Sequence, residues 1–578
     1  MREAFRSLVP YLWRYRRGLA LGLGSLAVKD LLAAALPLLI RAGIDSITSR
    51  FHFPTLVKFC GLLVGLAALK GVFQYWMRVI LIGISRDIEY DLRNDLFAHL
   101  LTLSPDYYAR TRTGDLMARA TNDLNAVRMM LGPGLMYWFE TSLTFLLAVA
   151  VMLSVDWQLT LLSLIPAPLV SLAVFWFGRL IHNRFERIQE MYSDISSRVQ
   201  ESLAGVRVLR AYVQEQAELL RFERLNRNYI AQNLRLARIS GAFLPLLQAL
   251  VGLTFLIVLW AGGSRVLSGR ISLGSFVMFS TYMGMLIWPM IALGWVVNLI
   301  QRGNASLGRI RQVLAERPAI AAPPAPRPVP EKADIELRAV SVLYPGGRAL
   351  DQVSLRIRSG ETLAIVGRTG SGKSTLVRLL PRLLDPDEGQ VLLGGVDLRD
   401  LDPAALRRRI GMVPQETLLF SATLAENIAF GVEQADQERI LWAARQAGLG
   451  PDLAGFPQGL ETLIGERGLT LSGGQKQRTA IARAILRDPE ILILDDALSS
   501  VDTLTEERIL RGLAEIMRGR TTILISHRVS TVRQADRIVV LEAGRIVEQG
   551  SHAELIAAGG YYADLYQKQL LEEELEAV

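Results

Sequence analysis

The stretch GRTGSGKST, residues 367–375, decides how the second half of the chain folds. Its glycines let backbone N–H groups close around phosphate oxygens, where a side chain would clash. In the pattern G-x-x-x-x-G-K-[ST], Lys373 reaches the β and γ phosphates, and the Ser374 hydroxyl ligates Mg²⁺. The predicted phosphate contacts come from Gly367, Arg368, Thr369, Gly370, Ser371, Gly372, Lys373, Ser374 and Thr375.

The flanks of this loop favour a phosphate site over a chance lysine in a glycine-rich turn. The preceding ETLAIVG is a short apolar run, typical of a buried parallel strand. The following STLVRLLPRLL has helical spacing, so the N-terminus of a helix points at the bound anion. Apolar strands alternate with amphipathic helices from about residue 333 onward, which indicates an α/β domain.

The first half of the chain is far more apolar and predicts a membrane domain. Of the 578 residues, 51% are hydrophobic, and the single cysteine, Cys60, excludes a disulfide framework within one chain. Each of six apolar stretches exceeds the roughly 20 residues that span a bilayer. The expected spans are 18–47, 55–84, 133–155, 157–181, 240–268 and 273–302.

Arginines set the expected orientation in the membrane. The net charge is +8, and many arginines lie in the two long gaps, 85–132 and 182–239. This pattern fits the cytoplasmic side of a cell membrane, with both termini inside, better than it fits nucleic-acid binding. We expect the gaps to continue the membrane helices, capped near Thr113–Val127 and Glu201–Gln216.

Proline marks the boundary between the halves. The segment RPAIAAPPAPRPVP, 317–330, contains six prolines, which rule out a continuous helix or central strand. The expected domains are a membrane domain at 1–316, a linker at 317–332, a nucleotide-binding domain at 333–566 and an acidic helical tail at 567–578. The tail is interpreted as a solvated chain end, or alternatively as a helix that packs on a partner chain.

Further motifs surround the phosphate loop. Tyr344, in SVLYPGG, is placed to stack on adenine. Gln415, in GMVPQETLLF, carries an amide that can ligate Mg²⁺ or orient water. His527 follows the apolar run of ILISHRV and is a candidate sensor of the γ-phosphate, although a lone histidine is usually structural.

Two aspartates follow the apolar run ILIL, residues 491–494. Asp495 emerges at the carboxyl end of the expected strand, where parallel sheets bind ligands, and it would hold Mg²⁺. Asp496 is placed to act on the attacking water, and Asp502 follows in a turn. The alternative for paired aspartates at this point is a helix cap.

LSGGQ, residues 471–475, precedes the helical stretch KQRTAIARAIL. A serine and two glycines at a helix start form a second anion site. An ordinary capped turn would use the same residue types.

Together these motifs resemble a half-transporter of the ATP-binding cassette (ABC) exporter family, over nearly the whole chain. The resemblance implies six membrane helices, then a nucleotide-binding domain that uses ATP and Mg²⁺. It assigns Gln415 to the glutamine loop, Asp495 to magnesium and His527 to the switch, and it makes TLIGERG, 462–468, the segment that senses coupling helices. It also implies that two such domains pair head to tail, so that one chain's signature acts on ATP held by the other. The signature and its neighbour are Ser472, Gly473, Gly474, Gln475 and Asp502.

One residue departs from the family pattern. Members usually carry glutamate as the general base after the magnesium aspartate, and this chain has Asp496. Its carboxylate is shorter by one methylene, and a misplacement near 1 Å can cost about 10²-fold in rate. We expect this site to bind ATP and hydrolyse it slowly, whereas the intact signature completes a partner's site. The chain then resembles one subunit of a heterodimeric exporter. The alternative is that Asp496 works through a shifted water in a homodimer.

Other functions remain as alternatives: a non-transporting cassette ATPase, which the six spans oppose, and an ATP-gated channel or regulator. The resemblance allows drugs, lipids or peptides as substrates. Charged residues within a span are costly and often functional, although interhelical pairing would also explain them. Candidates for a substrate cavity are Lys29, Asp30, Lys70, Arg78 and Glu140, and the tryptophans Trp76, Trp138 and Trp288 could line a route for amphiphiles.

Overall fold

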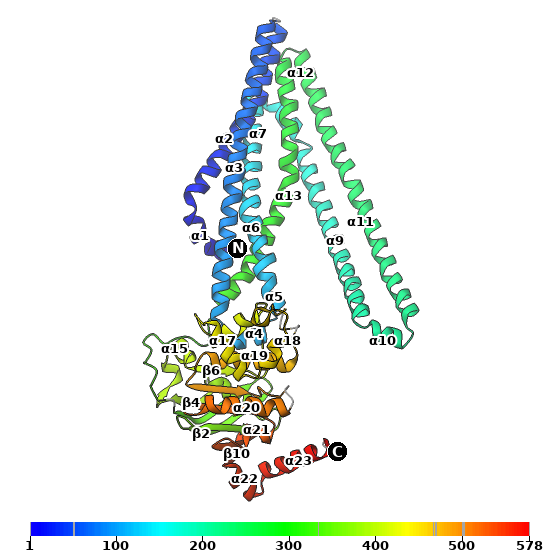
Figure 1. Cartoon of the computed structure of the whole chain (residues 1–578). Helices are drawn as coiled ribbons and strands as arrows, with labels where there is room; N and C mark the ends of the chain where they lie inside the picture. Colours follow the sequence, from blue (N-terminus) through cyan, green and yellow to red (C-terminus); the bar gives the residue numbers. More distant parts are fainter. Residues whose placement is uncertain are drawn as a thin grey trace. The chain divides into compact units, whose positions relative to one another are not determined.

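The computed structural model of the chain describes residues 2–49, 52–332, 334–465, 468, 471–499 and 503–576. The chain forms two compact units (Figure 1). The first comprises Met1–Leu101 and Arg112–Glu316, and the second comprises Thr102–Thr111 and Arg317–Val578. Helices build the first unit and two sheets with surrounding helices build the second, which confirms the expected fold class.

Six helical segments of the described chain are long and apolar enough to cross a membrane, as the hydropathy pattern predicts. Each is longer than the apolar stretch that it contains, because the amphipathic gaps continue as helix. The segments are Arg16–Ser49, Phe53–Thr102, Thr113–Val155, Trp157–Ala204, Glu215–Leu267 and Leu273–Ala315. Their helices are α2 (Arg16–Ser49), α3 (Phe53–Thr102), α5 (Thr113–Ala118), η1 (Arg119–Asp123), α6 (Leu124–Met129), η2 (Met130–Gly134), α7 (Leu135–Val155), α8 (Trp157–Leu164), α9 (Ala167–Ala204), α11 (Glu215–Ile257), η3 (Val258–Gly262), α12 (Gly263–Leu267) and α13 (Leu273–Ala315). A shorter helix, α1 (Arg2–Arg14), precedes them.

Only one of the two predicted caps between long helices is a short separate helix in the described chain. The segment Glu201–Gln216 contains the short helix α10 (Val206–Ala211), as expected. The segment Thr113–Val127 instead begins the third long helix, so its assignment as a cap is wrong. The short helix α4 (Pro105–Arg110) lies just before it. Pro105 sits in the first turn of α4, where a proline costs no hydrogen bond.

Within the first unit, α13 packs against α2 and α7, whereas α9 and α11 pair with each other (Figure 1). Few side chains of this pair are buried. In the 38 residues of α9 these are Val170, Phe177 and Ile188, and in the 43 residues of α11 they are Leu247 and Thr254. Most of the surface of this pair therefore has no partner within its own unit.

The second unit contains a four-stranded sheet, β2-β1-β4-β5, and a six-stranded sheet, β10-β9-β3-β8-β7-β6. In the larger sheet β3, β6, β7, β8 and β9 run parallel, and only β10 is antiparallel to its neighbour. The strands are β1 (Ile335–Tyr344), β2 (Gly347–Ile357), β3 (Thr362–Val366), β4 (Glu388–Leu393), β5 (Val396–Asp397), β6 (Ile410–Val413), β7 (Ile491–Asp495), β8 (Thr521–Ile525), β9 (Arg537–Glu542) and β10 (Arg545–Gly550).

The parallel strands are buried on both faces, which explains why they are continuous apolar runs rather than alternating ones. Alternate residues of β3 enter two different cores: Ala364 and Val366 join one, and Leu363 and Ile365 join the other. The first core also contains residues of α17 (Gln437–Gln446) and α19 (Gly473–Leu486), and the second contains residues of β1 and β2. Helices thus cover one face, and the smaller sheet together with α14 (Lys373–Leu379) covers the other.

The remaining elements of the second unit are short helices. They are α14 (Lys373–Leu379), η4 (Leu398–Asp400), α15 (Pro403–Arg408), α16 (Leu424–Ala429), α18 (Gly450–Gly455), η5 (Gly459–Glu461), α20 (Thr503–Met517), α21 (Val529–Val532), α22 (His552–Ala558) and α23 (Tyr561–Glu576). The last of these runs through residue 566, where the sequence suggested a boundary between domain and tail.

The proline-rich segment has no helix or ladder strand. Its backbone groups are held to the rest of the second unit by hydrogen bonds. The Arg327 N–H donates to the Asp400 carbonyl at 2.8 Å, and the Arg382 guanidinium reaches the Ala321 carbonyl at 3.4 Å. Arginine side chains thereby satisfy carbonyls that an extended proline-rich chain cannot pair within itself.

The two glycines at 370 and 372 provide a test of how tightly the phosphate loop is packed. Both have positive φ, 80° and 102°. A Cβ on Gly372 would lie 2.4 Å from the Ala349 carbonyl oxygen, whereas a Cβ on Gly370 meets nothing within 4 Å. We expect Gly370→Ala to cost about 1–2 kcal/mol from backbone conformation alone. Gly372→Ala should cost clearly more, because backbone must move.

Thermal unfolding of the purified full chain measures this difference. Equal melting temperatures for the two variants would contradict the close approach of strand β2 to the loop.

Candidate nucleotide site

The carboxyl ends of the parallel strands bring the predicted site residues to one edge of the larger sheet. Strand β8 pairs with β3 and β7, with Ile525 opposite both Ile365 and Asp495. Strand β6 pairs with β7 on its other side. The loops that carry Gly367, Gln415, Asp496 and His527 therefore all leave the sheet at this edge, where ligands bind in open α/β folds.

The phosphate loop joins β3 to the N-terminus of α14. The Lys373 ammonium lies inside the loop and donates to the carbonyls of Gly367 and Arg368, each at 2.8 Å. Burial lowers the pKa of Lys373, and the nearby carboxylates of Asp496 and Asp495 oppose that effect. A buried ammonium beside a helix N-terminus leaves a strong positive potential in the loop, which suits a phosphate chain.

The two predicted magnesium ligands of the strand and helix are in contact. The Ser374 hydroxyl donates to Asp495 Oδ1 at 3.1 Å, which places two hard oxygen donors side by side. Asp495 is 2% exposed, and its burial raises the pKa of the carboxyl. A divalent cation fits this pair, because it would compensate a carboxylate that is otherwise buried at a cost.

Replacing Asp495 with asparagine should separate the structural and cation-binding roles of this carboxylate. Asparagine keeps an oxygen that can accept from Ser374 but removes the buried charge. Because the pKa of Asp495 is raised in the folded chain, ionisation at neutral pH opposes folding, and D495N should raise the melting temperature without nucleotide. The same variant should lose the extra stabilisation that Mg²⁺ adds to ATP.

Melting curves at pH 7 with and without ATP and Mg²⁺ check both halves of this prediction. Equal cation-dependent stabilisation of the wild type and D495N would contradict the assigned role.

Asp496 occupies an unusual backbone position directly after β7. Its φ is 51°, in the left-handed region that aspartate tolerates better than most residues. Its N–H donates to the Ile525 carbonyl at 3.0 Å, and its carbonyl accepts from the Ser499 hydroxyl at 3.0 Å. The backbone is therefore fixed from both sides. The side chain is 8% exposed and close enough to Lys373 to affect that group's pKa.

Tyr344 and Gln415 lie on the surface beside this edge. Tyr344 ends β1 and pairs with Gly347 across the turn into β2, and it is 39% exposed. The same β2 strand approaches the phosphate loop at Gly372. Gln415 is exposed two residues after β6, the neighbour of β7. Both positions suit contacts with a nucleotide that projects from the loop.

The sequence LSGGQ forms the N-terminus of α19, with Ser472 as N-cap. The Ser472 hydroxyl accepts from the Gln475 N–H, and the Gln475 side chain accepts from the Ser472 N–H at 2.9 Å. The Gln475 amide also donates to Asp452, which pairs with Arg478. The capped-turn interpretation is thus confirmed as the local structure. Ser472 and Gly473 remain exposed at the helix start.

His527 follows β8 and is half-buried. Its backbone carbonyl accepts a hydrogen bond from the Gln569 amide of α23, a residue that no sequence motif singled out. Gln477, which donates to the Ser499 hydroxyl beside Asp496, was likewise missed. Both act through backbone or through another side chain, so composition and spacing carry no signal for them. Asp502 and part of 462–468 lie outside the described residues.

The charged residues predicted within the spans do not all meet. Lys29 is 4% exposed, and its ammonium lies 2.6 Å from both Asp30 and Glu140, so these three form a buried cluster between α2 and α7. Arg78, in contrast, lies on the exposed side of α3. The interhelical-pair interpretation therefore holds for three of the five residues.

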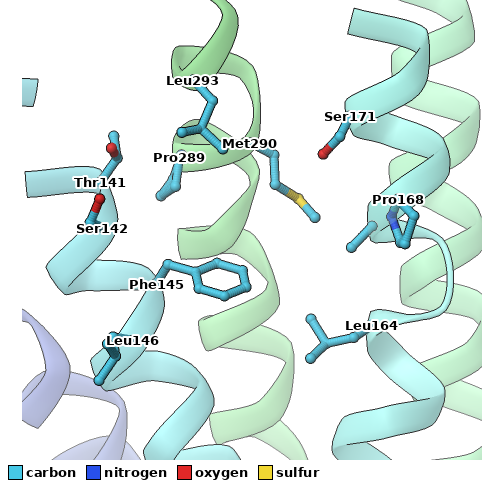
Figure 2. Close-up of a pocket in the computed structure, with 11 residues that line it drawn as sticks. Thr141, Ser142, Phe145, Leu146, Leu164, Pro168, Ser171, Pro289, Met290 and Leu293 are labelled. Atoms are coloured by element: carbon cyan, nitrogen blue, oxygen red, sulfur yellow. The ribbon is translucent and has the colours of Figure 1, made fainter. Parts of the chain in front are cut away.

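A cavity of about 520 Å³ lies between α7, the α8–α9 turn and α13. Figure 2 shows Thr141 and Ser142 on one side of the cavity and Ser171 on the opposite side, with Phe145 and Leu164 lower in the view. The complete lining is Thr141, Ser142, Phe145, Leu146, Leu164, Ala167, Pro168, Ser171, Pro289, Met290 and Leu293. None of the predicted charged or tryptophan candidates is among these residues. Trp76, Trp138 and Trp288 are between 41% and 58% exposed on the membrane unit.

Comparison with known proteins covers nearly the whole chain. The family model described as "ABC transporter transmembrane region" matches residues 19–290, and the one described as "ABC transporter" matches residues 350–499. A probable multidrug resistance ABC transporter ATP-binding/permease protein, YheI of Bacillus subtilis, is 40% identical over 93% of this chain and 92% of its own length.

Two further relatives and one solved structure also match nearly the whole length of this chain. The multidrug resistance-like ATP-binding protein MdlA of Escherichia coli is 38% identical over 98% of this chain and 97% of its own. An ATP-dependent lipid A-core flippase of Syntrophus aciditrophicus is 35% identical over 99% and 96%, respectively. The structure of a bacterial Atm1-family ABC exporter with ATP bound matches with a TM-score of 0.78 at 28% identity, covering 96% of this chain and 98% of the other.

Proposed function

This chain belongs to the ABC exporter family, and we propose that it exports an amphiphilic substrate as one subunit of a heterodimer. It is an ATP hydrolase that couples hydrolysis to transport across the membrane. It is a multi-pass membrane protein whose nucleotide-binding domain lies in the cytoplasm. In the proposed heterodimer its own ATP site turns over slowly, and its signature completes the fast site of a partner. The observation that carries the proposal is Asp496 where the family uses glutamate, beside an otherwise complete site.

Each residue at the sheet edge has a distinct role in the proposed reaction. Lys373 exchanges its bonds to the loop carbonyls for bonds to the β and γ phosphates. Ser374 and Asp495 would hold Mg²⁺, which supplies charge compensation for the phosphates, and Gln415 would join them. His527 contacts the γ-phosphate, and Tyr344 stacks on adenine. Asp496 is left to orient water and accept its proton.

The short carboxylate of Asp496 supports slow hydrolysis at this site. Its backbone is fixed by the bonds to Ile525 and Ser499, so the main chain cannot advance to compensate for the missing methylene. A general base must come within hydrogen-bond reach of the water that it activates, and an error near 1 Å costs about 10²-fold. Binding of ATP uses other residues and is expected to be unaffected.

Two surfaces support pairing with a second chain. Around α10, the apolar side chains of Val208, Tyr212 and Val213 are 61%, 73% and 80% exposed. Exposed apolar side chains clustered at the tip of a long helical pair are typical of an interaction site. The second surface is the exposed start of α19, where the Ser472 hydroxyl and the Gly473 N–H suit a phosphate that another chain supplies.

The cavity of Figure 2 supports an amphiphilic substrate. Its lining is mainly aliphatic and aromatic, with a few hydroxyl groups from Thr141, Ser142 and Ser171. Pockets that are largely apolar with a few polar groups fix the orientation of ligands having one polar end. The relatives named for multidrug resistance and for lipid A-core flipping are compatible with drugs or lipids as the substrate class.

Reconstitution in lipid vesicles tests the proposal. The purified chain alone should show little ATPase, whereas the chain with a glutamate-bearing partner should hydrolyse ATP and move an amphiphilic dye against its gradient. Strong ATPase and uphill transport by the chain alone would establish the homodimeric alternative instead. Passive, ATP-gated flux without uphill movement would establish a channel.

A further inference from the structure

The loop that carries His527 is fixed from two sides by residues outside the nucleotide site. It runs from the end of β8 to the start of α21. On one side, the buried carboxylate of Glu506 in α20 accepts from Arg528 and from the Thr531 hydroxyl. On the other side lies Gln569 of the last helix, α23.

The Gln569 amide makes two bonds to the backbone around the histidine. Its Nε2 donates to the carbonyl of His527, and its Oε1 accepts from the N–H of Val529 at 2.7 Å. These two backbone groups flank Arg528 and lie between the end of β8 and the start of α21. Backbone groups at this position have no partners in a strand ladder or a helix. A side chain that engages both at once fixes the orientation of the peptide units between them, and thus the direction in which the His527 ring leaves the backbone.

Helix α23 is itself held in place, so Gln569 is not an adaptable contact of a loose tail. The N–H groups of Tyr561 and Tyr562 donate to the carboxylate of Glu548 at 2.6 and 3.1 Å. The Tyr562 hydroxyl lies 2.8 Å from His552 Nδ1, and the Tyr562 side chain is fully buried. The first turn of α23 is therefore anchored to β10 and α22.

The same helix also contacts the phosphate loop. The Arg368 guanidinium lies 5.9 Å from the centre of the Tyr561 ring, within the range of a cation–π interaction. One rigid helix thus contacts the phosphate loop at its start and the histidine loop two turns later. Its position therefore relates the phosphate loop to the loop that carries the proposed γ-phosphate contact, His527.

We propose that Gln569 is a positioning residue for His527: the C-terminal helix sets the orientation of the histidine loop and so the discrimination between ATP and ADP. The inference rests on the proposed role of His527 as the contact of the γ-phosphate. Gln569 itself touches neither nucleotide nor water in this role. The helix that the sequence suggested to be a solvated tail is in this account part of the nucleotide sensor.

The test compares Gln569→Ala with Gln567→Ala in the full-length chain. Gln567 lies on the same helix but is exposed, so the pair matches the chemical change and separates the contact. The first measurement is the ratio of the dissociation constants for ADP and ATP in the presence of Mg²⁺. Q569A should lower this ratio about 2–10-fold, the worth of one hydrogen bond or a little more, and Q567A should leave it unchanged.

A second variant separates the two bonds. Gln569→Glu retains an acceptor for the Val529 N–H but replaces the donor to the His527 carbonyl with a repelling oxygen. It should keep slow hydrogen exchange at the Val529 amide and still lower the ADP-to-ATP ratio, whereas Q569A should speed exchange at that amide. Wild-type discrimination in Q569E would overturn the proposal, because the bond to the histidine carbonyl would then be irrelevant.

A double-mutant cycle with His527→Ala closes the test. If Gln569 acts through the histidine, Q569A should have no further effect on the ratio once His527 is gone. An equal loss in both backgrounds would overturn the proposal, since it would reveal general destabilisation. Unchanged exchange at Val529 in Q569A would overturn the contact itself. Wild-type discrimination in H527A alone would refute the role of His527 in the proposed function and, with it, the inference that depends on that role.

Discussion

Replacing Asp496 with glutamate is expected to raise ATP turnover at the site built on this chain's phosphate loop by about 10²-fold. The added methylene moves the carboxylate by roughly 1 Å toward the water that it must activate, and general-base catalysis depends steeply on that distance. The steady-state rate of the purified chain, whose copies can supply one another's intact signature, is the quantity to measure.

The fixed backbone at this position means that the substitution changes the length of the side chain and not the path of the main chain. The bonds of Asp496 to Ile525 and Ser499 hold its φ at 51°, whichever acidic side chain is present. Glutamate is less well tolerated than aspartate in that region, so D496E should lower the melting temperature slightly while it raises the rate.

Asp496→Asn is the matched control, because it preserves shape and removes the base. If Asp496 contributes little, D496N should reduce the already slow rate only modestly. A loss of 10²–10⁴-fold in D496N, together with no gain in D496E, would mean that Asp496 already works as the base. The heterodimer proposal would then lose its main support.

Replacing Ser472 with alanine is expected to reduce the ATPase of the assembled transporter by about 10²–10³-fold, the usual cost of removing a donor to a transition-state anion. In the proposed heterodimer this serine acts on the ATP of the partner, which is the fast site. Asp496→Asn in the same assembly should change the rate by less than about twofold, since its own site contributes little. The heterodimer proposal thus predicts a large loss of ATPase for S472A and almost none for D496N, although both residues belong to the same chain.

Loss of a helix cap could also lower the rate by destabilising α19, at about 1 kcal/mol. Ser551→Ala controls for this effect. Ser551 caps α22 with the same reciprocal arrangement that Ser472 forms with Gln475, at a helix start remote in sequence from the signature. S551A should match S472A in thermal stability and retain the ATPase. Similar losses of activity in both would contradict a direct role for Ser472.

Much of the nucleotide domain could be predicted from sequence because its strands are apolar on both faces. The runs 363–366, 491–494 and 523–525 give β3, β7 and β8, and the polar residues just beyond them give the site. Lys373, Ser374 and Asp495 meet because the carboxyl ends of parallel strands share an edge, a consequence of topology rather than of any one residue.

The contacts that sequence reasoning missed depend on tertiary structure. Gln569 lies in a polar stretch that ends with LLEEELEAV, and nothing in its neighbourhood distinguishes it from Gln567. The cavity lining is also undistinguished: Phe145, Leu164 and Met290 are apolar residues of mainly apolar spans. Three of the charged residues that drew attention, Lys29, Asp30 and Glu140, instead form ion pairs with one another.

The misplaced cap at Thr113–Val127 has a different cause. The segment lies in the long gap 85–132, where a cap was expected, but the helical segment runs from Thr113 to Val155. The stop signal lies earlier, where Ser104 and Pro105 end the preceding helix and begin α4. A proline at a helix start was the better guide to this boundary than the distribution of charge.

Single-turnover analysis of the isolated chain tests the central claim most directly. The full-length protein in lipid nanodiscs is mixed with a slight excess of radiolabelled ATP and Mg²⁺, separated from free nucleotide and quenched at intervals. The account predicts one nucleotide bound per chain, recovered largely as ATP long after the D496E variant has converted its own to ADP. Rapid conversion to ADP by the wild-type chain, or no bound nucleotide at saturating ATP, would contradict it.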